Sequence, residues 1–178
     1  VTYSYIGSRE KILSSVSRSF ELGKFYAITG KSGAGKSTML SLLAGLDRPN
    51  SGEVMFRGEN IERKGYSNHR KNNISLVFQN YNLIDYLSPL ENIRLVNSNA
   101  SDEMLLKLGL DKSQIKRNVM KLSGGQQQRV AIARALASEA PVILADEPTG
   151  NLDPNTAGEI IEMLKKLAKE RNKCVIVV

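Results

Sequence analysis

The chain has 178 residues and a mass of 19.6 kDa, which predicts one domain, or one domain with a small insertion. No apolar run approaches the roughly 18 residues that a membrane-spanning helix needs, and no secretory leader opens the sequence. The formal net charge of +7 leaves three kinds of anionic partner open: nucleic acid, an anionic membrane surface and a phosphorylated ligand.

The first part of the chain predicts an antiparallel β part, then a buried strand, a glycine-rich loop and a helix. Residues 1–6 carry two tyrosines in an alternating pattern, and residues 11–20 predict a second strand. Phe25–Thr29 has the aromatic and β-branched character of a short buried strand. Met39–Leu46 has the apolar content of a packed helix.

The loop between that strand and that helix is a candidate phosphate-binding loop. Its sequence, Gly30-Lys31-Ser32-Gly33-Ala34-Gly35-Lys36-Ser37-Thr38, fits the G-x-x-x-x-G-K-[ST] pattern in the strand-to-helix context that the pattern requires. The glycines let backbone N–H groups approach a phosphate chain, and the helix N-terminus adds the positive end of its dipole. Lys36 then supplies a charge for the β- and γ-phosphates, and Ser37 supplies a hydroxyl for Mg²⁺. We therefore predict a nucleotide site here.

The next stretch is mainly polar. Residues 47–52 form a dense turn signal, residues 53–57 predict a strand, and residues 58–73 predict a loop with a short helix. His69, the only histidine, lies in this stretch, and we expect it on the surface rather than as a ligand or a base. The same stretch holds a modest basic cluster that is typical of a solvated loop: Arg63, Lys64, Arg70 and Lys71.

A second buried strand, Ile74–Phe78, ends at Gln79. After it, residues 86–138 are helical in character, with no strand-like run, and predict a helical insertion. Capping boxes at Ser88 and Ser123 mark two helix starts within it. The N-terminus at Ser123 also offers a hydroxyl, backbone N–H groups and a helix dipole to a phosphate. By chemistry alone, an ordinary cap and a second phosphate-binding end are equally good interpretations.

The last part predicts a strand, a helix and a strand, so the whole chain predicts an α/β fold with a mostly parallel sheet. The strand Pro141–Ala145 ends in Asp146-Glu147, at the sheet edge where ligands of open α/β folds bind. We predict that Asp146 holds Mg²⁺ opposite Ser37 and that Glu147 orients or deprotonates an attacking water. An isolated Asp-Glu pair is usually surface charge, but the upstream phosphate loop favours the functional interpretation.

Asp153-Pro154 predicts the cap of the last helix, and the run Cys174–Val178 suits a buried strand. The single cysteine excludes an internal disulfide and fits a reducing compartment, with Cys174 a small core hydrophobe. The sequence starts with Val1 rather than Met and stops inside a strand-like run, and from this we expect a fragment of a longer protein.

With these motifs in order, the chain resembles the ABC ATPases over essentially its whole length. Leu122-Ser123-Gly124-Gly125-Gln126 matches the signature motif of that family, and the phosphate loop, Gln79, Asp146-Glu147 and the turn at residues 151–153 follow the family's order. The stretch 145–153 and the context of Gln79 look most like the lipoprotein-release, macrolide-export and cell-division branch.

The resemblance implies a P-loop NTPase core with an N-terminal antiparallel β part and a helical insertion. The implied division is residues 1–85 as the first part of the ATP-binding core, 86–138 as the helical signature subdomain, and 139–178 as the second part of the core.

The resemblance also implies site roles for further residues. Adenine would stack on an aromatic near the N-terminus, for which we prefer Tyr5 to Tyr3. Gln79 would contact Mg²⁺ or the γ-phosphate side. The signature segment, with Ser123, Gly125 and Gln126, would cap the ATP of a second copy in a head-to-tail dimer, and Asp153 would communicate across that interface. Each chain has one complete triphosphate site and one further phosphate-binding helix end. In a two-fold dimer, each chain can use its extra helix end at the site of the other chain.

The sequence departs from the family pattern at one point. The family places a switch histidine just after the final core strand, and the sequence ends at Val178. His69 precedes Gln79 and cannot take that role. We therefore expect this chain to bind ATP and to hydrolyse it slowly.

Three functions remain open from the sequence. The first is an ATPase subunit, cytoplasmic and peripheral on the inner face of the membrane, that powers a separate membrane-spanning transporter or extractor. The second transmits force across the membrane to an envelope enzyme. The third is an ATPase of the same superfamily that acts on nucleic acid. We expect no nucleic-acid partner, because the chain has one cassette and no long coiled coil. For the first two, a docking surface and ordinary packing are equally good interpretations of five residues: Tyr81, Leu83, Ile84, Tyr86 and Leu87.

Overall fold

Four parallel strands form the central sheet of the computed structural model, which describes residues 1–8 and 10–178. The strand order is β1-β6-β5-β4, with parallel pairing throughout. The strands are β1 (Phe25–Ala27), β4 (Ile74–Phe78), β5 (Val142–Asp146) and β6 (Cys174–Val177). The predicted parallel α/β fold is confirmed. β-Branched and apolar runs form the strands, and β4, β5 and β6 bury most of their residues.

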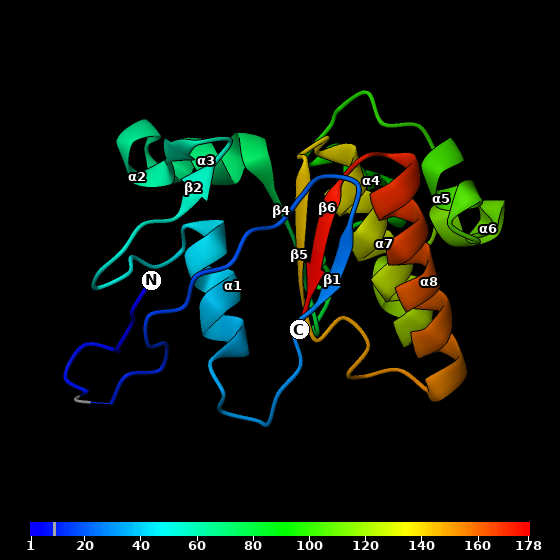
Figure 1. Cartoon of the computed structure of the whole chain (residues 1–178). Coiled ribbons are helices and arrows are strands. Elements are labelled where there is room, and N and C mark those ends of the chain that lie inside the picture. The colour runs from blue at the N-terminus through cyan, green and yellow to red at the C-terminus, as the bar shows by residue number, and fades with distance from the viewer. Residues whose placement is uncertain (9) are drawn as a thin grey trace.

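Helices cover both faces of the sheet (Figure 1). The first helix, α1 (Lys36–Ala44), packs on one face against β5, and α7 (Gly124–Ala137) and α8 (Pro154–Glu170) pack on the other. The loop from β1 to α1, the segment after β5 and the C-terminus all lie at the carboxyl edge of the sheet (Figure 1). The topology therefore gathers segments that are distant in sequence at one edge, where ligands of open sheets bind.

A group of helices lies between β4 and β5 in the chain, and residues 86–138 contain no strand, as predicted. They are α4 (Pro89–Arg94), α5 (Glu103–Lys107), α6 (Lys112–Ile115), the 3₁₀ turn η1 (Val119–Lys121) and α7. Their fully buried side chains share the largest core cluster with β5, β6 and α8, for example Ile93, Leu105, Ile132, Ile143 and Ile160. Among the described residues, no helix combines the length and the apolar character that crossing a bilayer would require.

The two strands predicted near the N-terminus do not form. Residues 1–6 and 11–20 contribute only isolated antiparallel bridges, Tyr3 to Leu13 and Thr2 to Ser51. Positive φ angles at Gly7 and Ser15 turn the chain before a longer ladder can develop. Instead, Tyr3 and Leu13 anchor this segment in a small core with Leu42 of α1.

Residues 53–73 are more ordered than the sequence predicts. A two-residue turn at Arg57-Gly58, with φ of 51° and 79°, joins β2 (Met55–Phe56) to β3 (Glu59–Asn60) in an antiparallel pair. Two helices follow, α2 (Ile61–Lys64) and α3 (Tyr66–Asn73). The predicted five-residue strand is therefore short, and the predicted loop is mostly helix. Contacts of α2 and α3 with the end of α1, at Leu43 and Gly45, offset the low apolar content of this stretch.

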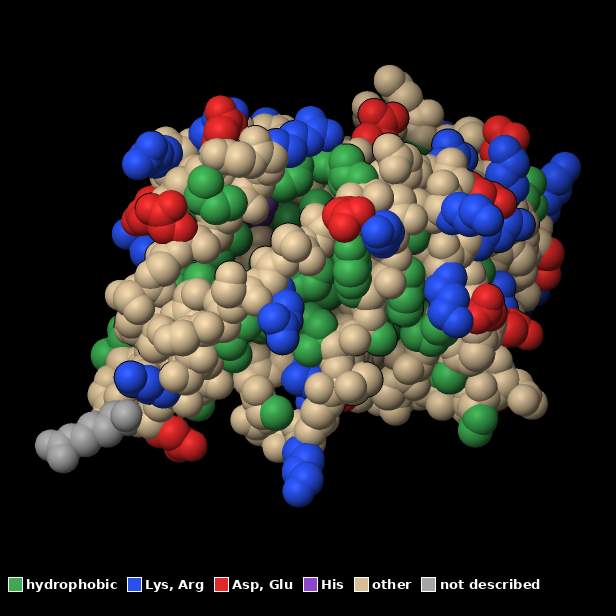
Figure 2. Space-filling view, viewed as in Figure 1, with side chains coloured by type: hydrophobic (Ala, Val, Ile, Leu, Met, Phe, Trp, Pro, Cys, Tyr) green, Lys and Arg blue, Asp and Glu red, His purple; other side chains and the backbone are tan. Residues whose placement is uncertain are grey.

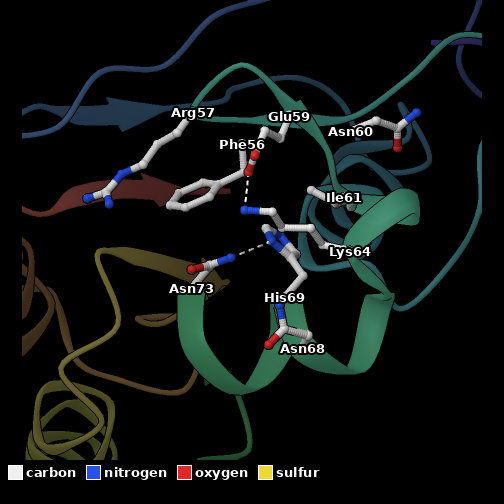
Figure 3. A pocket seen from close by; sticks show the side chains of 9 residues that line it. All are labelled: Phe56, Arg57, Glu59, Asn60, Ile61, Lys64, Asn68, His69 and Asn73. Atoms are coloured by element: carbon white, nitrogen blue, oxygen red, sulfur yellow. Dashed lines mark hydrogen bonds and ion pairs between the residues drawn. The ribbon is translucent and has the colours of Figure 1, made fainter.

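The prediction of a surface histidine is wrong. His69 of α3 is 3 % exposed and lines a small pocket beside Phe56 and Asn73 (Figure 3). Its Nε2 lies 3.0 Å from the Leu43 carbonyl oxygen, and the Asn73 side-chain amide lies 3.2 Å from its Nδ1. Burial lowers the pKa of His69. The neutral imidazole thus caps the C-terminal end of α1. The polar residues around His69 in the sequence show no hydrophobic periodicity that would have predicted its burial.

An apolar cleft of about 500 Å³ opens between α1, the segment 16–22, β2 and the sheet. Figure 2 shows hydrophobic side chains gathered in this hollow. Its walls include Phe20, Leu43, Met55, Val142 and Ile176. Cys174 lies in the same wall, and burial raises the pKa of its thiol to about 11, in agreement with the predicted role of a core hydrophobe.

Candidate functional site

The predicted phosphate loop joins β1 to α1 at the carboxyl edge of the sheet. Gly33 and Gly35 have φ of 80° and 82°, which side chains with a Cβ rarely adopt. Gly35 also lies against Ile12, where an added Cβ would come within 2.9 Å of Cγ2. Gly35 is the N-cap of α1 and offers no side-chain cap, so the first amides of the helix stay free for an anion.

Two side chains of α1 make polar contacts at this edge of the sheet. The Lys36 ammonium donates to the carbonyls of Gly30 and Lys31, both at 3.1 Å, and so lies over its own loop. The Ser37 hydroxyl donates to Asp146 Oδ1 at 2.9 Å across 109 residues of sequence. The structure therefore brings together the phosphate loop and the carboxylate at the end of β5.

A cavity of about 360 Å³ lies beside this contact. Its walls include Ser37, Gln79, Asp146 and Glu147, four of the predicted site residues. A hydroxyl, a carboxylate and an amide oxygen are hard oxygen ligands of the kind that Mg²⁺ prefers. The predicted metal-binding side chains thus face one cavity and fit the ion chemically.

Glu147 follows Asp146 at the mouth of the same cavity. Its φ is 45°, a left-handed conformation that is unfavourable for a residue before proline. Two backbone bonds at 3.1 Å hold the turn: the Glu147 amide donates to the Val178 carbonyl, and the Gly150 amide donates to the Glu147 carbonyl. Glu147 is exposed at this edge of the sheet.

Gln79 is held by a partner that the sequence did not single out as a site residue. The Asn151 amide donates to the Gln79 carbonyl at 3.2 Å, and the Gln79 amide donates to Asn151 Oδ1 at 3.4 Å. Asn151 belongs to the 151–153 turn that the sequence analysis noted as a family motif. The motif did not indicate that Asn151 binds Gln79. Arg134 of α7 completes the support by donating to the carbonyls of Tyr81 and Asn82 at 3.1 and 2.6 Å.

The preferred aromatic, Tyr5, is half exposed, and Tyr3 is buried. The Tyr5 hydroxyl lies 2.9 Å from Thr38 Oγ1 at the start of α1. The two rings meet edge to face at 5.2 Å, so Tyr3 fixes the position of Tyr5. A planar base beside the phosphate loop can thus reach Tyr5 and not Tyr3.

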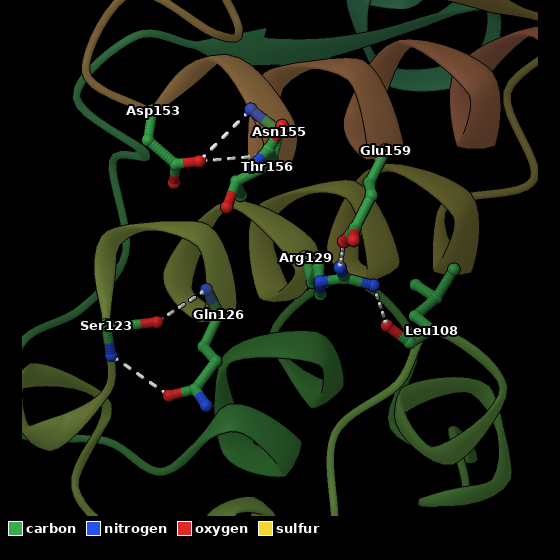
Figure 4. A network of polar contacts seen from close by, with 8 residues as sticks. All are labelled: Leu108, Ser123, Gln126, Arg129, Asp153, Asn155, Thr156 and Glu159. Carbon is green, nitrogen blue, oxygen red and sulfur yellow. Dashed lines mark hydrogen bonds and ion pairs between the residues drawn. The ribbon is translucent and has the colours of Figure 1, made fainter.

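The signature segment forms a second cavity of about 360 Å³ with the 151–153 turn and the start of α8. Ser123 and Gln126 form a complete capping box: the Gln126 amide donates to Ser123 Oγ at 3.3 Å, and the Ser123 amide donates to Gln126 Oε1 at 3.0 Å (Figure 4). Both side chains thus cap their own helix in this structure. Gly124 and Gly125 of the first turn also line the second cavity.

Gly124 and Gly125 serve close packing rather than backbone freedom, because both have helical backbone. A Cβ on Gly125 would lie 2.5 Å from Thr156 Cγ2, and one on Gly124 would lie 2.8 Å from the Tyr81 hydroxyl. These short approaches press the start of α7 against α8 and against the loop after Gln79. The sequence predicted phosphate chemistry here and did not show this packing.

Asp153 caps α8 as predicted. Its Oδ1 accepts the amides of Asn155 and Thr156, both at 3.1 Å (Figure 4). The Thr156 hydroxyl, followed by these amides, holds the pKa of Asp153 below its ordinary value. Nearby, Arg129 of α7 pairs with Glu159 and donates to the Leu108 carbonyl at 2.9 Å. Arg129 thus links α7, which lines the second cavity, to α8 through Glu159 and to the helical insertion through Leu108.

The two cavities have no wall residue in common. The phosphate loop and the signature segment therefore do not enclose one ligand within a single chain. Among the five residues for which docking and packing were equally good interpretations, two pack within the chain and two are exposed. Leu83 packs against the main core, and the Tyr81 hydroxyl lies against Gly124, whereas Ile84 and Tyr86 are exposed.

A family model described as ABC transporter matches residues 13–150, which is more than half of the chain. The chain belongs to the ABC transporter ATP-binding family. The lipoprotein-releasing system ATP-binding protein LolD 1 of Chlorobium chlorochromatii is 42% identical over 185 residues, spanning 96% of this chain and 74% of that protein. The macrolide export ATP-binding/permease protein MacB of Hyphomonas neptunium is 41% identical over 179 residues, spanning 92% of this chain and 28% of that protein.

A solved structure agrees with the family. The dimeric post-hydrolysis state of the ATP-binding cassette MJ0796 of Methanocaldococcus jannaschii, bound to ADP and Pi, aligns with a TM-score of 0.84 and 39% identity. The alignment covers 100% of this chain and 84% of that one. The predicted family and its lipoprotein-release and macrolide-export branch are confirmed. As an ABC ATPase domain the chain binds ATP, with Mg²⁺ as the usual partner ion.

Proposed function

We propose that this ABC ATPase domain hydrolyses ATP as a head-to-tail dimer and thereby powers a separate membrane-spanning subunit that transports or extracts a substrate. The observation that carries the proposal is the 2.9 Å contact of Ser37 with Asp146, with Glu147 next to it and the signature segment in a separate cavity. Each chain thus has one triphosphate site and one helix end suited to the site of another copy.

The roles in this proposal follow from the side chains. The phosphate-loop amides and Lys36 bind the triphosphate, and Tyr5 stacks on the base. Ser37, Asp146 and Gln79 hold the Mg²⁺, which neutralises charge on the phosphate oxygens. Glu147 orients the attacking water and accepts its proton. Ser123, Gly125 and Gln126 of a second copy close over the nucleotide, and Asp153 lies at that interface.

The hydrolysis part is tested with Glu147→Gln. The variant keeps the side-chain shape and loses the proton acceptor, so single-turnover release of phosphate should fall about 100-fold or more, with ATP affinity within about twofold of wild type. Lys36→Ala is the contrasting variant, because it removes a phosphate ligand and should weaken ATP binding itself. Wild-type phosphate release by Glu147→Gln would refute the role of Glu147.

The dimer part is tested by sedimentation velocity with Mg-ATP. Glu147→Gln should accumulate as an ATP-dependent dimer, because slow hydrolysis preserves the enclosed nucleotide. Adding Ser123→Arg should abolish that dimer, since the bulky cation fills the second cavity, while leaving ATP binding by the single chain intact. A dimer of unchanged stability in the double variant would show that the signature segment does not close over the nucleotide.

The membrane part rests on the exposed side chains beside the Gln79 loop. Ile84 and Tyr86 are 36 % and 80 % exposed. They belong to the segment that follows Gln79 in the chain, so a partner that contacts this segment would act on the Mg²⁺ side through Gln79. Tyr86→Asp should abolish co-purification with the membrane subunit and leave ATP binding unchanged. Leu46→Asp, at an exposed apolar side chain just after α1, is the control. Equal recovery of the membrane subunit with both variants would contradict this docking surface.

A further inference from the structure

One side chain of α7 is buried at a cost that packing does not explain. Gln128 is fully buried, at 0 % exposure, between the capping box and the apolar residues Val130 and Ile132 of the same helix. Its Oε1 has no hydrogen-bond partner among the described residues. An unpaired amide oxygen in a core destabilises the fold, and an apolar side chain of the same length would avoid that cost. This cost directs attention to what the other half of the amide does.

The other half of this amide makes a contact at the candidate active site. Gln128 Nε2 donates to the Pro148 carbonyl at 2.6 Å. Pro148 directly follows Glu147, whose φ of 45° is strained before a proline. Two backbone hydrogen bonds hold Glu147 itself. The bond from Gln128 adds a side-chain contact to the carbonyl of the next residue, Pro148.

Helix α7, which carries Gln128, is held in place by packing on several sides. It packs against β4, α4 and α8, and its residues from Val130 to Ala133 are buried. The distance from α7 to the Pro148 carbonyl therefore sets where the Glu147 turn lies. Because Ser123 begins the same helix, the signature segment and the Glu147 turn of one chain are held at a fixed spacing through Gln128.

We propose that Gln128 is a positioning residue for Glu147: it holds the strained Glu147–Pro148 turn by donating to the Pro148 carbonyl, so that the carboxylate meets the attacking water. This inference rests on the proposed function, in which Glu147 accepts the proton of that water. It assigns Gln128 no contact with nucleotide or metal ion.

The test compares Gln128→Met with Ser75→Ala. Methionine keeps the length and removes both the donor and the unpaired oxygen. Ser75 is buried in β4 beside Ile143 of β5. Its hydroxyl donates to the Ala135 carbonyl of α7 at 2.9 Å and contacts the Ser138 hydroxyl at the end of α7. Ser75→Ala therefore also removes buried side-chain hydrogen bonding to this helix, without touching the turn at Glu147. Both variants are compared by urea unfolding, ATP affinity, single-turnover phosphate release and amide hydrogen exchange of nucleotide-free protein.

We expect Gln128→Met to unfold at a urea midpoint no lower than that of Ser75→Ala and to bind ATP within about twofold of wild type. The Gly150 amide, which closes the turn on the Glu147 carbonyl, should exchange about tenfold faster without nucleotide. Phosphate release should slow about 10- to 100-fold. Ser75→Ala should change neither exchange at Gly150 nor phosphate release. Unchanged exchange and unchanged phosphate release in Gln128→Met would overturn the proposal.

Gln128→Glu provides a second route, also if the methionine variant fails to fold. A buried glutamic acid in its protonated form can donate its O–H to the Pro148 carbonyl, whereas the carboxylate cannot. Phosphate release relative to wild type should therefore be higher at about pH 6 than at about pH 9. A ratio that does not change with pH counts against the positioning role.

Parallel assays of Glu147→Gln separate this inference from the function on which it rests. If Glu147→Gln hydrolyses ATP like wild type, the proposed role of Glu147 fails. If Glu147→Gln is inactive and the Gln128 variants are unaffected, only the positioning role fails.

Discussion

The close contact between α7 and α8 gives a quantitative prediction for Gly125. In Gly125→Ala the new methyl would lie 2.5 Å from Thr156 Cγ2, too close for any real pair of carbons. Overpacking of this kind costs about 1–3 kcal/mol, and the helix propensity of alanine returns at most about 1 kcal/mol. We therefore expect the free energy of unfolding to fall by about 1–2 kcal/mol.

Thr156→Ser should rescue this variant. Serine removes Cγ2 and keeps the hydroxyl beside Asp153, and the remaining Thr156 atoms lie at 3.8 and 3.9 Å from the added methyl, which is ordinary contact. In the Thr156→Ser background, Gly125→Ala should be neutral or stabilising by up to about 1 kcal/mol, which gives a coupling energy of about 1–3 kcal/mol between the two positions.

Urea unfolding of the four proteins in this double-mutant cycle measures the coupling. Gly158→Ala is the control, because an added Cβ at Gly158 of α8 meets nothing within 4 Å, and it should stabilise by about 0.5–1 kcal/mol. Additive effects of Gly125→Ala and Thr156→Ser would refute the packing argument. Restored stability without restored ATP-dependent dimerisation would assign Gly125 a further role at the partner's nucleotide.

Three other predictions concern titration and capping. Because burial lowers the pKa of His69, the unfolded chain binds the proton more tightly than the native chain. The free energy of unfolding should therefore decline as the pH drops below about 6.5, and a urea series should show a shallower decline for His69→Gln; equal slopes would argue against the buried imidazole. Cys174, whose thiol pKa is raised to about 11, should resist iodoacetamide at about pH 8 in the folded chain and react on unfolding; equal rates in both states would contradict its burial. Asp153→Ala should cost about 1 kcal/mol of unfolding free energy and Asp153→Asn much less, because asparagine also caps helices; equal losses would place the effect outside the cap.

The sequence determined the features that arise from neighbouring residues. The phosphate loop is a contiguous pattern between a strand and a helix. The caps at Ser88, Ser123 and Asp153 depend on contacts two or three positions apart. The strands at Ile74–Phe78 and Val142–Asp146 follow from continuous apolar runs. Local physics of this kind needs no knowledge of the rest of the chain.

Tertiary structure decided what depends on register and packing between distant segments. It brings Ser37 to Asp146 and Asn151 to Gln79, it places the Gln128 amide under Pro148, and it makes Gly125 a contact point for Thr156. It also buries a histidine from a polar stretch and leaves the N-terminal strands as isolated bridges. The periodicity of the sequence predicts which face of a helix or strand a side chain occupies. Only the assembled sheet and helices decide which residues that face contacts.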